Sequence, residues 1–252
     1  MTIWVDTHCH LQLSEDSASD MLDRAQAVGV HWVVAPGTDA STSEASRRLA
    51  DEFPDRVLAT AGLHPHHAER WSEEREAITR LGSVASAIGE CGLDFYRNLA
   101  PRDDQVGAFV AQVALARELD KPVIVHCRDA FAEVHDLLEA SGWAHRAVLH
   151  CWTGGPKWTR RFRDLGVTFS FAGPITFETG DTVRLGAALA PHERTMIETD
   201  TPYLTPPPGR GLANEPANVV AVGEALAAVW DVPVGEVAQL TTATASRVFG
   251  RG

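Results

Sequence analysis

Six side chains with metal-ligating chemistry are spread along the sequence, each beside a short apolar stretch: His8, His10, Glu90, His126, His150 and Asp200. His8 and His10 are two residues apart, so in an extended chain both imidazoles face the same side. Four histidines and two carboxylates exceed the three protein ligands that one catalytic zinc ion usually has. The set therefore predicts two divalent metal ions (Zn²⁺, Mn²⁺ or Mg²⁺) that share a carboxylate and a water.

The chemistry that such a site performs is hydrolysis. Two neighbouring cations lower the pKa of a shared water and polarise a phosphoryl or carbonyl oxygen. Asp200 is the candidate catalytic base that accepts the proton of this water, and it can also bind a metal. A single buried histidine is more often a hydrogen-bonded core residue, so the prediction depends on the six residues together.

Short apolar runs, rich in β-branched and aromatic residues, alternate with longer helical patterns. The runs predict strands at Thr2–Asp6, His31–Ala35, Val57–Leu63, Ala85–Glu90, Pro122–His126, Ala147–His150, Val167–Phe171 and Thr195–Thr199. Helices are expected at Ser14–Val28 with Ser14 as N-cap, at Pro101–Leu119 with proline in the first turn, and at Ala130–Ala140 before Gly142. A loop rich in proline and glycine, Thr201–Pro216, precedes two or three final helices.

Eight strand–helix units in 252 residues match the size of a (β/α)8 TIM barrel, here a single domain over residues 1–252. The predicted ligands fall at or just past the carboxyl ends of the strands, with Glu90 ending the fourth, and this is the end at which barrel enzymes build their active sites. The alternative is a doubly wound open sheet. That fold usually has a glycine-rich phosphate turn after its first strand, where this chain has histidines.

Composition limits the classes of protein that fit. Hydrophobic residues make up 44%, no stretch approaches the length of a membrane span, and the N-terminus does not have the pattern of a signal peptide, so we expect a cytoplasmic protein, and a monomer. The net charge of −12 argues against long-range attraction to polyanions. It does not exclude a nucleic-acid substrate, because bound cations and local arginines offset the field at the site.

Four cysteines, Cys9, Cys91, Cys127 and Cys151, include no CxxC pair. Each directly follows a predicted ligand, so strand alternation should turn it toward the outer helices. We therefore interpret the cysteines as packing residues rather than ligands.

Several motifs resemble the TatD family of metal-dependent deoxyribonucleases, in the order of that family and over nearly the whole chain: Asp6-Thr7-His8-Cys9-His10-Leu11, Gly62-Leu63-His64-Pro65-His66, Ile88-Gly89-Glu90-Cys91-Gly92-Leu93-Asp94, Val125-His126-Cys127-Arg128-Asp129-Ala130, His150-Cys151-Trp152-Thr153-Gly154 and Glu198-Thr199-Asp200-Thr201-Pro202-Tyr203-Leu204. The resemblance implies a metallo-dependent hydrolase barrel in which His8, His10, Glu90 and Asp200 hold one metal and Glu90, His126 and His150 hold the other. Glu90 is then the bridge. The implied activity is hydrolysis of DNA from the 3′ end, with single-stranded ends preferred over duplex.

Other residues are candidates for substrate contact. The resemblance places His64 over the substrate phosphate, although a loop histidine is the alternative. Arg128 is a candidate phosphate clamp, or else pairs with Asp129 or Glu133 at the rim. The remaining candidates are Thr153, Tyr203 and Arg210.

Three further side chains are expected to act indirectly or to pack. Glu198 is two residues before Asp200, so we expect it beneath the site, where it orients a ligating histidine. Asp94 is expected to fix the loop after the fourth strand, and Trp152 either stacks on a base or packs at the rim.

The sequence departs from the family at two places. Trp152-Thr153 replaces a frequent Phe-Ser, and Arg210-Gly211-Leu212-Ala213 has two fewer positive charges than the family's usual loop. A depleted basic loop keeps a second hypothesis open, a deacylase of D-aminoacyl-tRNA, since ester hydrolysis uses the same activated water. A third, a non-catalytic metal-binding protein, is opposed by the intact ligand set.

Overall fold

The computed structural model describes residues 2–251, and the end residues of the predicted domain, Met1 and Gly252, lie outside them. Within this range eight parallel strands form one sheet in which each strand lies beside its sequence neighbours. The strands are β1 (Trp4–Asp6), β2 (Val30–Ala35), β3 (Val57–Ala61), β4 (Ala87–Asp94), β5 (Val123–Arg128), β6 (Ala147–Leu149), β7 (Thr168–Phe171) and β8 (Thr195–Ile197).

The sheet closes on itself between its first and last strands. The Thr7 N–H donates to the Ile197 carbonyl at 3.1 Å, and Cys9 forms a parallel bridge with Thr201 just past the strand ends. The prediction of a (β/α)8 barrel is therefore confirmed, and the alternative of an open doubly wound sheet is wrong.

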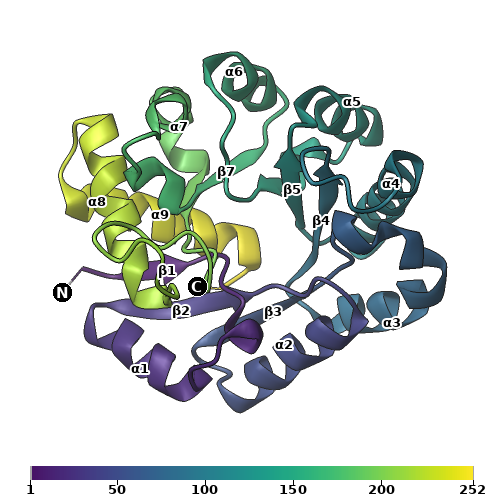
Figure 1. Cartoon of the computed structure of the whole chain (residues 1–252), viewed down its shortest axis with the longest axis horizontal. Coiled ribbons are helices and arrows are strands. Elements are labelled where there is room, and N and C mark those ends of the chain that lie inside the picture. The colour runs from purple at the N-terminus through teal and green to yellow at the C-terminus, as the bar shows by residue number, and fades with distance from the viewer. Residues whose placement is uncertain (1, 252) are drawn as a thin grey trace.

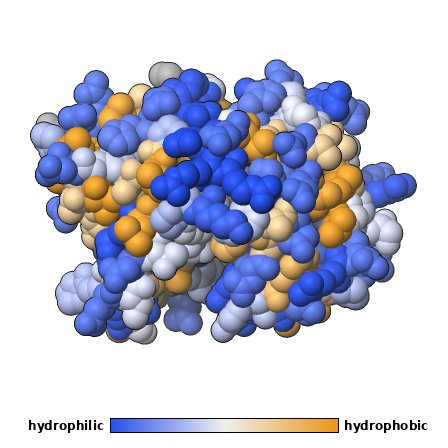
Figure 2. Space-filling model, turned by 90° about the horizontal axis from the view of Figure 1, so that it is seen from above, coloured by the Kyte–Doolittle hydropathy of each residue, from blue (hydrophilic) through white to orange (hydrophobic). Residues whose placement is uncertain are grey.

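Helices form a ring around the strands (Figure 1). In the described residues they are α1 (Ala18–Ala27), α2 (Ala40–Glu52), α3 (Trp71–Val84), α4 (Arg102–Glu118), α5 (Phe131–Ser141), α6 (Pro156–Asp164), α7 (Asp181–Ala187), α8 (Val219–Trp230) and α9 (Val234–Phe249). Across residues 2–251, no single helix has the length and apolar character to cross a membrane, and only the pair Pro216–Trp230 and Val234–Phe249, bent by 110°, reaches that length together. Seen at 90° to Figure 1, the surface is mostly hydrophilic, with hydrophobic residues in separate patches (Figure 2).

The last helix closes the amino end of the barrel. Ala245 and Phe249 of α9 join a buried cluster with inward-facing strand residues that include Val5, Ile124 and Met196. The apolar plug leaves the opposite end, at the carboxyl ends of the strands, for polar side chains.

Two predicted boundaries are wrong at the ends of helices. Ser14 follows a short 3₁₀ helix, Leu11–Leu13, and the N-cap of α1 is Ser17, whose hydroxyl accepts the Asp20 N–H at 3.2 Å. Pro101 is the N-cap residue of α4 rather than part of its first turn. The predicted stop of α5 is confirmed, since Gly142 is its C-cap with φ of 66°.

The strand that carries Glu90 is longer than predicted. β4 continues four residues past Glu90, because Gly92, Leu93 and Asp94 keep pairing with β5 as far as Asp94 opposite Arg128. Glu90 thus lies inside the barrel strand and not at its end. His126 is likewise inside β5, whereas His150 and Thr199 lie just past the ends of β6 and β8.

Close backbone packing beside Glu90 requires glycine. At Gly92, where φ is +140°, a Cβ atom would lie 2.0 Å from the His126 carbonyl oxygen of the neighbouring strand. Both the clash with backbone and the positive φ penalise any larger residue. Gly107, in the exposed part of α4, has no heavy atom within 4 Å of the corresponding position.

We predict opposite effects for alanine at these two glycines. Gly92→Ala should lower the free energy of unfolding by more than about 2 kcal/mol, because β4 and β5 must separate. Gly107→Ala should raise it by about 0.5–1 kcal/mol, because alanine costs less entropy in a helix interior. Urea denaturation of both variants measures this, and equal midpoints for Gly92→Ala and the unsubstituted chain would contradict the close packing.

Candidate metal centre

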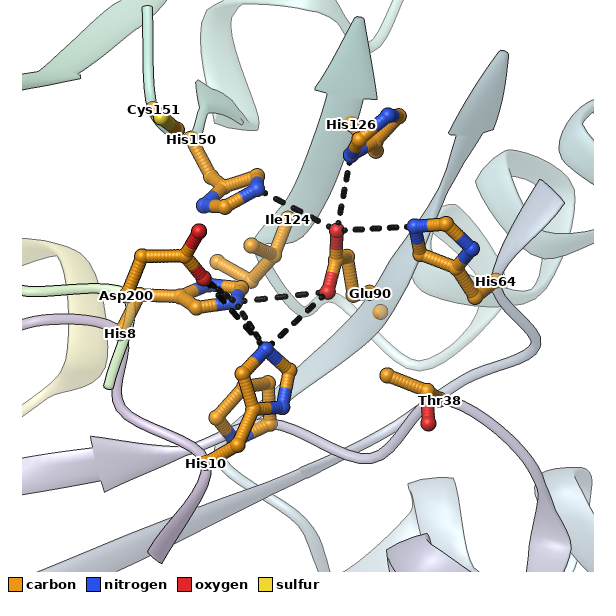
Figure 3. A network of polar contacts seen from close by, with 12 residues as sticks. His8, His10, Thr38, His64, Glu90, Ile124, His126, His150, Cys151 and Asp200 are labelled. Carbon is orange, nitrogen blue, oxygen red and sulfur yellow. Dashed lines mark hydrogen bonds and ion pairs between the residues drawn. The ribbon is translucent and has the colours of Figure 1, made fainter. Parts of the chain in front are cut away.

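Five histidine side chains converge on the carboxylate of Glu90 at the carboxyl end of the barrel, and the Asp200 carboxylate lies beside two of them (Figure 3). These six side chains come from the ends or continuations of β1, β3, β5, β6 and β8. They are the five predicted ligands other than Glu90, which are His8, His10, His126, His150 and Asp200, and in addition His64. The Glu90 side chain is only 4% exposed. A buried carboxylate is costly unless it is paired, and here it is surrounded by imidazoles.

The first group of ligands faces one oxygen of Glu90. The Nε2 atoms of His8 and His10 lie 3.3 Å and 3.7 Å from its Oε2 atom, and 3.8 Å and 3.5 Å from Oδ1 of Asp200. The two Nε2 atoms are 3.2 Å apart. Ligands at about 2.1 Å from a tetrahedral ion are roughly 3.4 Å from one another, so these atoms fit a divalent cation.

The second group faces the other oxygen of the same carboxylate. Nδ1 of His126, Nε2 of His150 and Nε2 of His64 lie 3.0 Å, 3.2 Å and 3.3 Å from Oε1 of Glu90. The family resemblance implies a position for His64 over the substrate, whereas in the structure its ring is as close to Glu90 as the rings of the predicted ligands. Each oxygen of Glu90 therefore has its own set of imidazoles.

Burial and the neighbouring charges set the protonation of these groups. Burial raises the pKa of the Glu90 carboxyl, but the charges of His150 and His64 and hydrogen bonds from His126 and His150 hold it well below its usual range. Burial lowers the pKa of His8, and lowers that of His64 to about 4. The pKa shifts of His8 and His64 favour neutral rings beside an ionised carboxylate. Neutral imidazoles present lone pairs to a cation, and they are donors that Zn²⁺ and Mn²⁺ bind.

Glu198 lies beneath this site and contacts one of its histidines. Its Oε1 atom lies 2.9 Å from Nδ1 of His150 and accepts the Cys151 N–H at 2.6 Å. Its Oε2 atom accepts the Ser170 hydroxyl at 2.6 Å. Although burial opposes it, the charges of Glu90 and Glu198 raise the pKa of His150 well above its usual value. These contacts leave Nε2 of His150 directed at Glu90.

Two carboxylates at the site were not recognised from the sequence as part of it. Oδ1 of Asp6 accepts the N–H groups of Thr199 and His8, at 2.9 Å and 3.2 Å, and so fastens the end of β8 to the end of β1. Burial raises the pKa of Asp6 to about 8, although those hydrogen bonds act to lower the pKa. Strand alternation in the sequence could have assigned Asp6 to the site, since residues 6, 8 and 10 share one face of an extended chain.

Asp94 contacts both the loop after β4 and the histidines. Its Oδ1 atom accepts the Arg97 N–H at 2.8 Å, as expected for a residue that fixes this loop. Its Oδ2 atom lies 2.8 Å from Nε2 of His66 and 3.1 Å from Nε2 of His126. Because β4 continues past Glu90, Asp94 is on the same strand face, four residues further along.

A cavity of about 870 Å³ opens beside the cluster and is lined by Arg128, Thr153 and Tyr203 among the candidate substrate residues. Arg128 has no carboxylate within 4.0 Å in the described part of the chain, so the predicted alternative of a rim ion pair with Asp129 or Glu133 is wrong. Arg210 does not line the cavity, and its guanidinium carbon lies 3.7 Å from the centre of the Phe177 ring.

Trp152 is a core residue and not a stacking platform. It is 1% exposed, its indole N–H donates to the Thr159 hydroxyl at 2.9 Å, and its ring packs against Phe131 and Phe162. Of the two roles considered for it, only packing is compatible with this burial.

The cysteines behave as predicted with one exception. Cys9, Cys91 and Cys127 belong to the core cluster between the barrel and its helices, and among residues 2–251 no candidate ligand group contains a cysteine. Cys151 is not in that cluster and borders the cavity, as Cys127 also does. Its φ of +44° interrupts the extended backbone, so strand alternation does not apply to it.

Comparison with known proteins agrees with this site. The family model described as TatD-related DNase matches residues 5–250. The chain belongs to the TatD-related DNase family. It is 36% identical over 250 residues to the uncharacterized metal-dependent hydrolase YabD of Bacillus subtilis (strain 168), covering 97% of this chain and 98% of that protein. It is 40% identical over 205 residues to the 3′-5′ ssDNA/RNA exonuclease TatD of Rahnella sp. (strain Y9602), covering 79% of this chain and 76% of that protein.

Solved structures give the same fold. The crystal structure of YJJV, a TatD homolog from Escherichia coli K12, superposes with a TM-score of 0.92 at 27% identity, covering 98% of both chains. A β-aspartyl dipeptidase from Fervidobacterium islandicum AW-1 shares the barrel at a TM-score of 0.65 and 16% identity, covering 99% of this chain and 74% of that one. The chain is thus a metal-dependent hydrolase of the TatD-related DNase family, and its family membership, rather than the barrel, indicates which bond it cleaves.

We predict that Glu198 supports metal binding through His150. Glu198→Ala should weaken metal affinity by about 10–100-fold, because the His150 ring loses the acceptor that orients it. Glu198→Gln should recover most of this affinity, since its amide oxygen still accepts. Equilibrium dialysis with Mn²⁺ or Zn²⁺ measures the effect, with Glu224→Ala on the exposed face of α8 as the control. Unchanged affinity in Glu198→Ala would contradict the role.

Proposed function

We propose that the protein is a metal-dependent exonuclease that removes nucleotides from the 3′ end of single-stranded nucleic acid. The observation that supports this proposal most directly is that the two carboxylate oxygens of Glu90 face two separate sets of imidazoles. A carboxylate shared in this way is the bridging ligand of a two-metal hydrolytic site. His8, His10, Glu90 and Asp200 would hold one cation. Glu90, His126 and His150 would hold the other, with His64 as a further ligand.

When bound, the cations supply an activated water and stabilise the charge that develops on the phosphoryl oxygens. Asp200 would accept the proton of that water, since it lines the cavity and its side chain is 15% exposed, whereas that of Glu90 is 4% exposed. Burial raises the pKa of Asp200, but a hydrogen bond from His10 and the charges of His150 and His8 hold it below its usual range, so the carboxylate is ionised. Arg128 holds the substrate phosphate through its N–H edge.

The substrate class follows from relatives and from the shape of the site. The relative at 40% identity is named as an exonuclease of single-stranded DNA and RNA, and the relatives described here are named as nucleases or hydrolases rather than deacylases. Hydrolysis of D-aminoacyl-tRNA is therefore not favoured. A cavity of about 870 Å³ has room for a strand end of a few nucleotides.

The proposal predicts metal-dependent shortening of a labelled strand. Protein loaded with Mn²⁺, Mg²⁺ or Zn²⁺ should convert 5′-labelled single-stranded DNA or RNA into a ladder of progressively shorter products, and a chelator should stop the reaction. Glu90→Gln should lower kcat by more than about 100-fold, since even indirect changes around metal ligands cost 10–100-fold. Glu224→Gln is the matched control. Internal fragments without a ladder, or no cleavage with any of the three metals, would exclude the proposed activity.

A separate prediction concerns Arg128. Arg128→Ala should lower kcat/KM for single-stranded DNA by about tenfold, because one charge-assisted phosphate contact is lost. The slope of log kcat/KM against log salt should become less negative by about 0.7, the value for one phosphate contact on a single strand. Arg160→Ala, an exposed arginine of α6, is the control. An unchanged salt slope in Arg128→Ala would show that this side chain does not contact phosphate.

A further inference from the structure

The chain contains two tyrosines, and neither is buried. Tyr203, 53% exposed, lines the cavity, and its ring centre lies 6.2 Å from that of His10. Tyr96, 64% exposed, lies in the loop between β4 and α4. The strands that precede the two tyrosines, β4 and β8, are four strands apart in the barrel. Tyr96 is not itself among the residues that line the cavity, but its neighbour Arg97 is. No role for Tyr96 follows from packing, because so little of it is buried.

Tyr96 forms a cation–π pair with Arg128. The guanidinium carbon of Arg128 lies 4.1 Å from the centre of the Tyr96 ring, which is the contact distance of a cation–π pair. Arg128 lines the cavity and has no carboxylate within 4.0 Å anywhere in residues 2–251. Its N–H edge is therefore available to an anion while its face is held by the ring.

The backbone holds this pair in a fixed place relative to the metal centre. The Phe95 N–H donates to the Arg128 carbonyl at 2.9 Å, which extends the ladder between β4 and β5 to Phe95, the residue before Tyr96. The Asn98 N–H donates to the Asp94 carbonyl at 3.1 Å, and the Arg97 N–H donates to the Asp94 carboxylate at 2.8 Å. The same carboxylate contacts His66 and His126, so a single side chain joins the loop to the histidines.

We propose that Tyr96 and Arg128 form a nucleotide-binding site, in which an unpaired nucleobase stacks on the pair while the Arg128 edge contacts the adjoining phosphate. The inference rests on the proposed function and assigns it a base-binding subsite. Aromatic rings and guanidinium planes are the surfaces on which single-stranded bases stack, and stacking tolerates any base because each has a π face. A base inside a duplex has both faces covered, so this site favours single strands.

Binding to a strand that resists hydrolysis tests the site directly. The probe is a short fluorescent single strand with phosphorothioate linkages, added to Mn²⁺-loaded protein and followed by anisotropy. Tyr96→Ala should raise Kd by about tenfold, and Tyr96→Phe should bind as the unsubstituted chain does, because the ring and not the hydroxyl stacks. Leu185→Ala, a comparably exposed residue of α7, is the control and should leave Kd unchanged.

A series of strands, each with one abasic position, identifies the base that stacks. At one position, loss of the base should raise the Kd of the unsubstituted chain to the value that Tyr96→Ala shows with the intact strand. The same loss should leave the Kd of Tyr96→Ala unchanged, because the two changes remove the same contact. The site would be overturned by an unchanged Kd for Tyr96→Ala, by no binding by the unsubstituted chain, or by an equal increase in Kd for both proteins at every abasic position.

Cleavage of an unprotected strand is measured separately. If the protein cleaves the strand but the effects of Tyr96→Ala and of the abasic position on Kd are independent, the base-binding site is refuted and the proposed activity stands. If the two effects depend on each other but no strand is cleaved, the site stands and the proposed activity is refuted.

Discussion

Burial of the Glu90 carboxylate is the constraint on which the rest of the structure depends. A carboxylate with 4% of its side chain exposed loses its hydration, and the loss must be offset by positive charge or hydrogen bonds. The offset comes from imidazoles on four other chain segments, which converge only because the barrel brings the carboxyl ends of its strands to one end. Neutral imidazoles such as His8 and His64 do not balance the charge by themselves. A site built in this way therefore favours the binding of cations, and its hydrolytic chemistry follows from them.

The same constraint explains the close packing around β4. Glu90 reaches the centre of the cluster because β4 lies against β3 and β5 with backbone nearly in contact. A Cβ atom at Gly62 would lie 2.5 Å from the Gly89 backbone, and one at Gly92 would lie 2.0 Å from the His126 carbonyl oxygen. Asp6 fixes the register between β1 and β8, because its carboxylate accepts hydrogen bonds from Thr199 and from the His8 N–H. Backbone register, rather than side-chain packing, thus sets the distances between the ligands.

Local spacing was sufficient to predict the barrel, the strand order and the set of side chains that meet, because strand periodicity and strand ends are local properties of the sequence. It was insufficient wherever a contact depends on the register between strands or on one backbone angle. The extension of β4 to Asp94 arises from pairing with β5, and the approach of His64 to Glu90 depends on where β3 ends. Cys151 departs from alternation because of its positive φ. The extent of the domain, residues 1–252, stays a prediction.

The net charge of −12 restricts where on the molecule a nucleic-acid strand can be attracted. An anionic surface repels a nucleic-acid strand over most of the molecule, so affinity must arise where positive charge is concentrated. The cavity supplies this in two ways, through the cations that its histidines and carboxylates bind and through Arg97 and Arg128 on its wall. An attraction confined to one cavity acts on the few nucleotides that enter it and not along a strand. A strand end meets this requirement with the least bending, which is consistent with the proposed removal of terminal nucleotides.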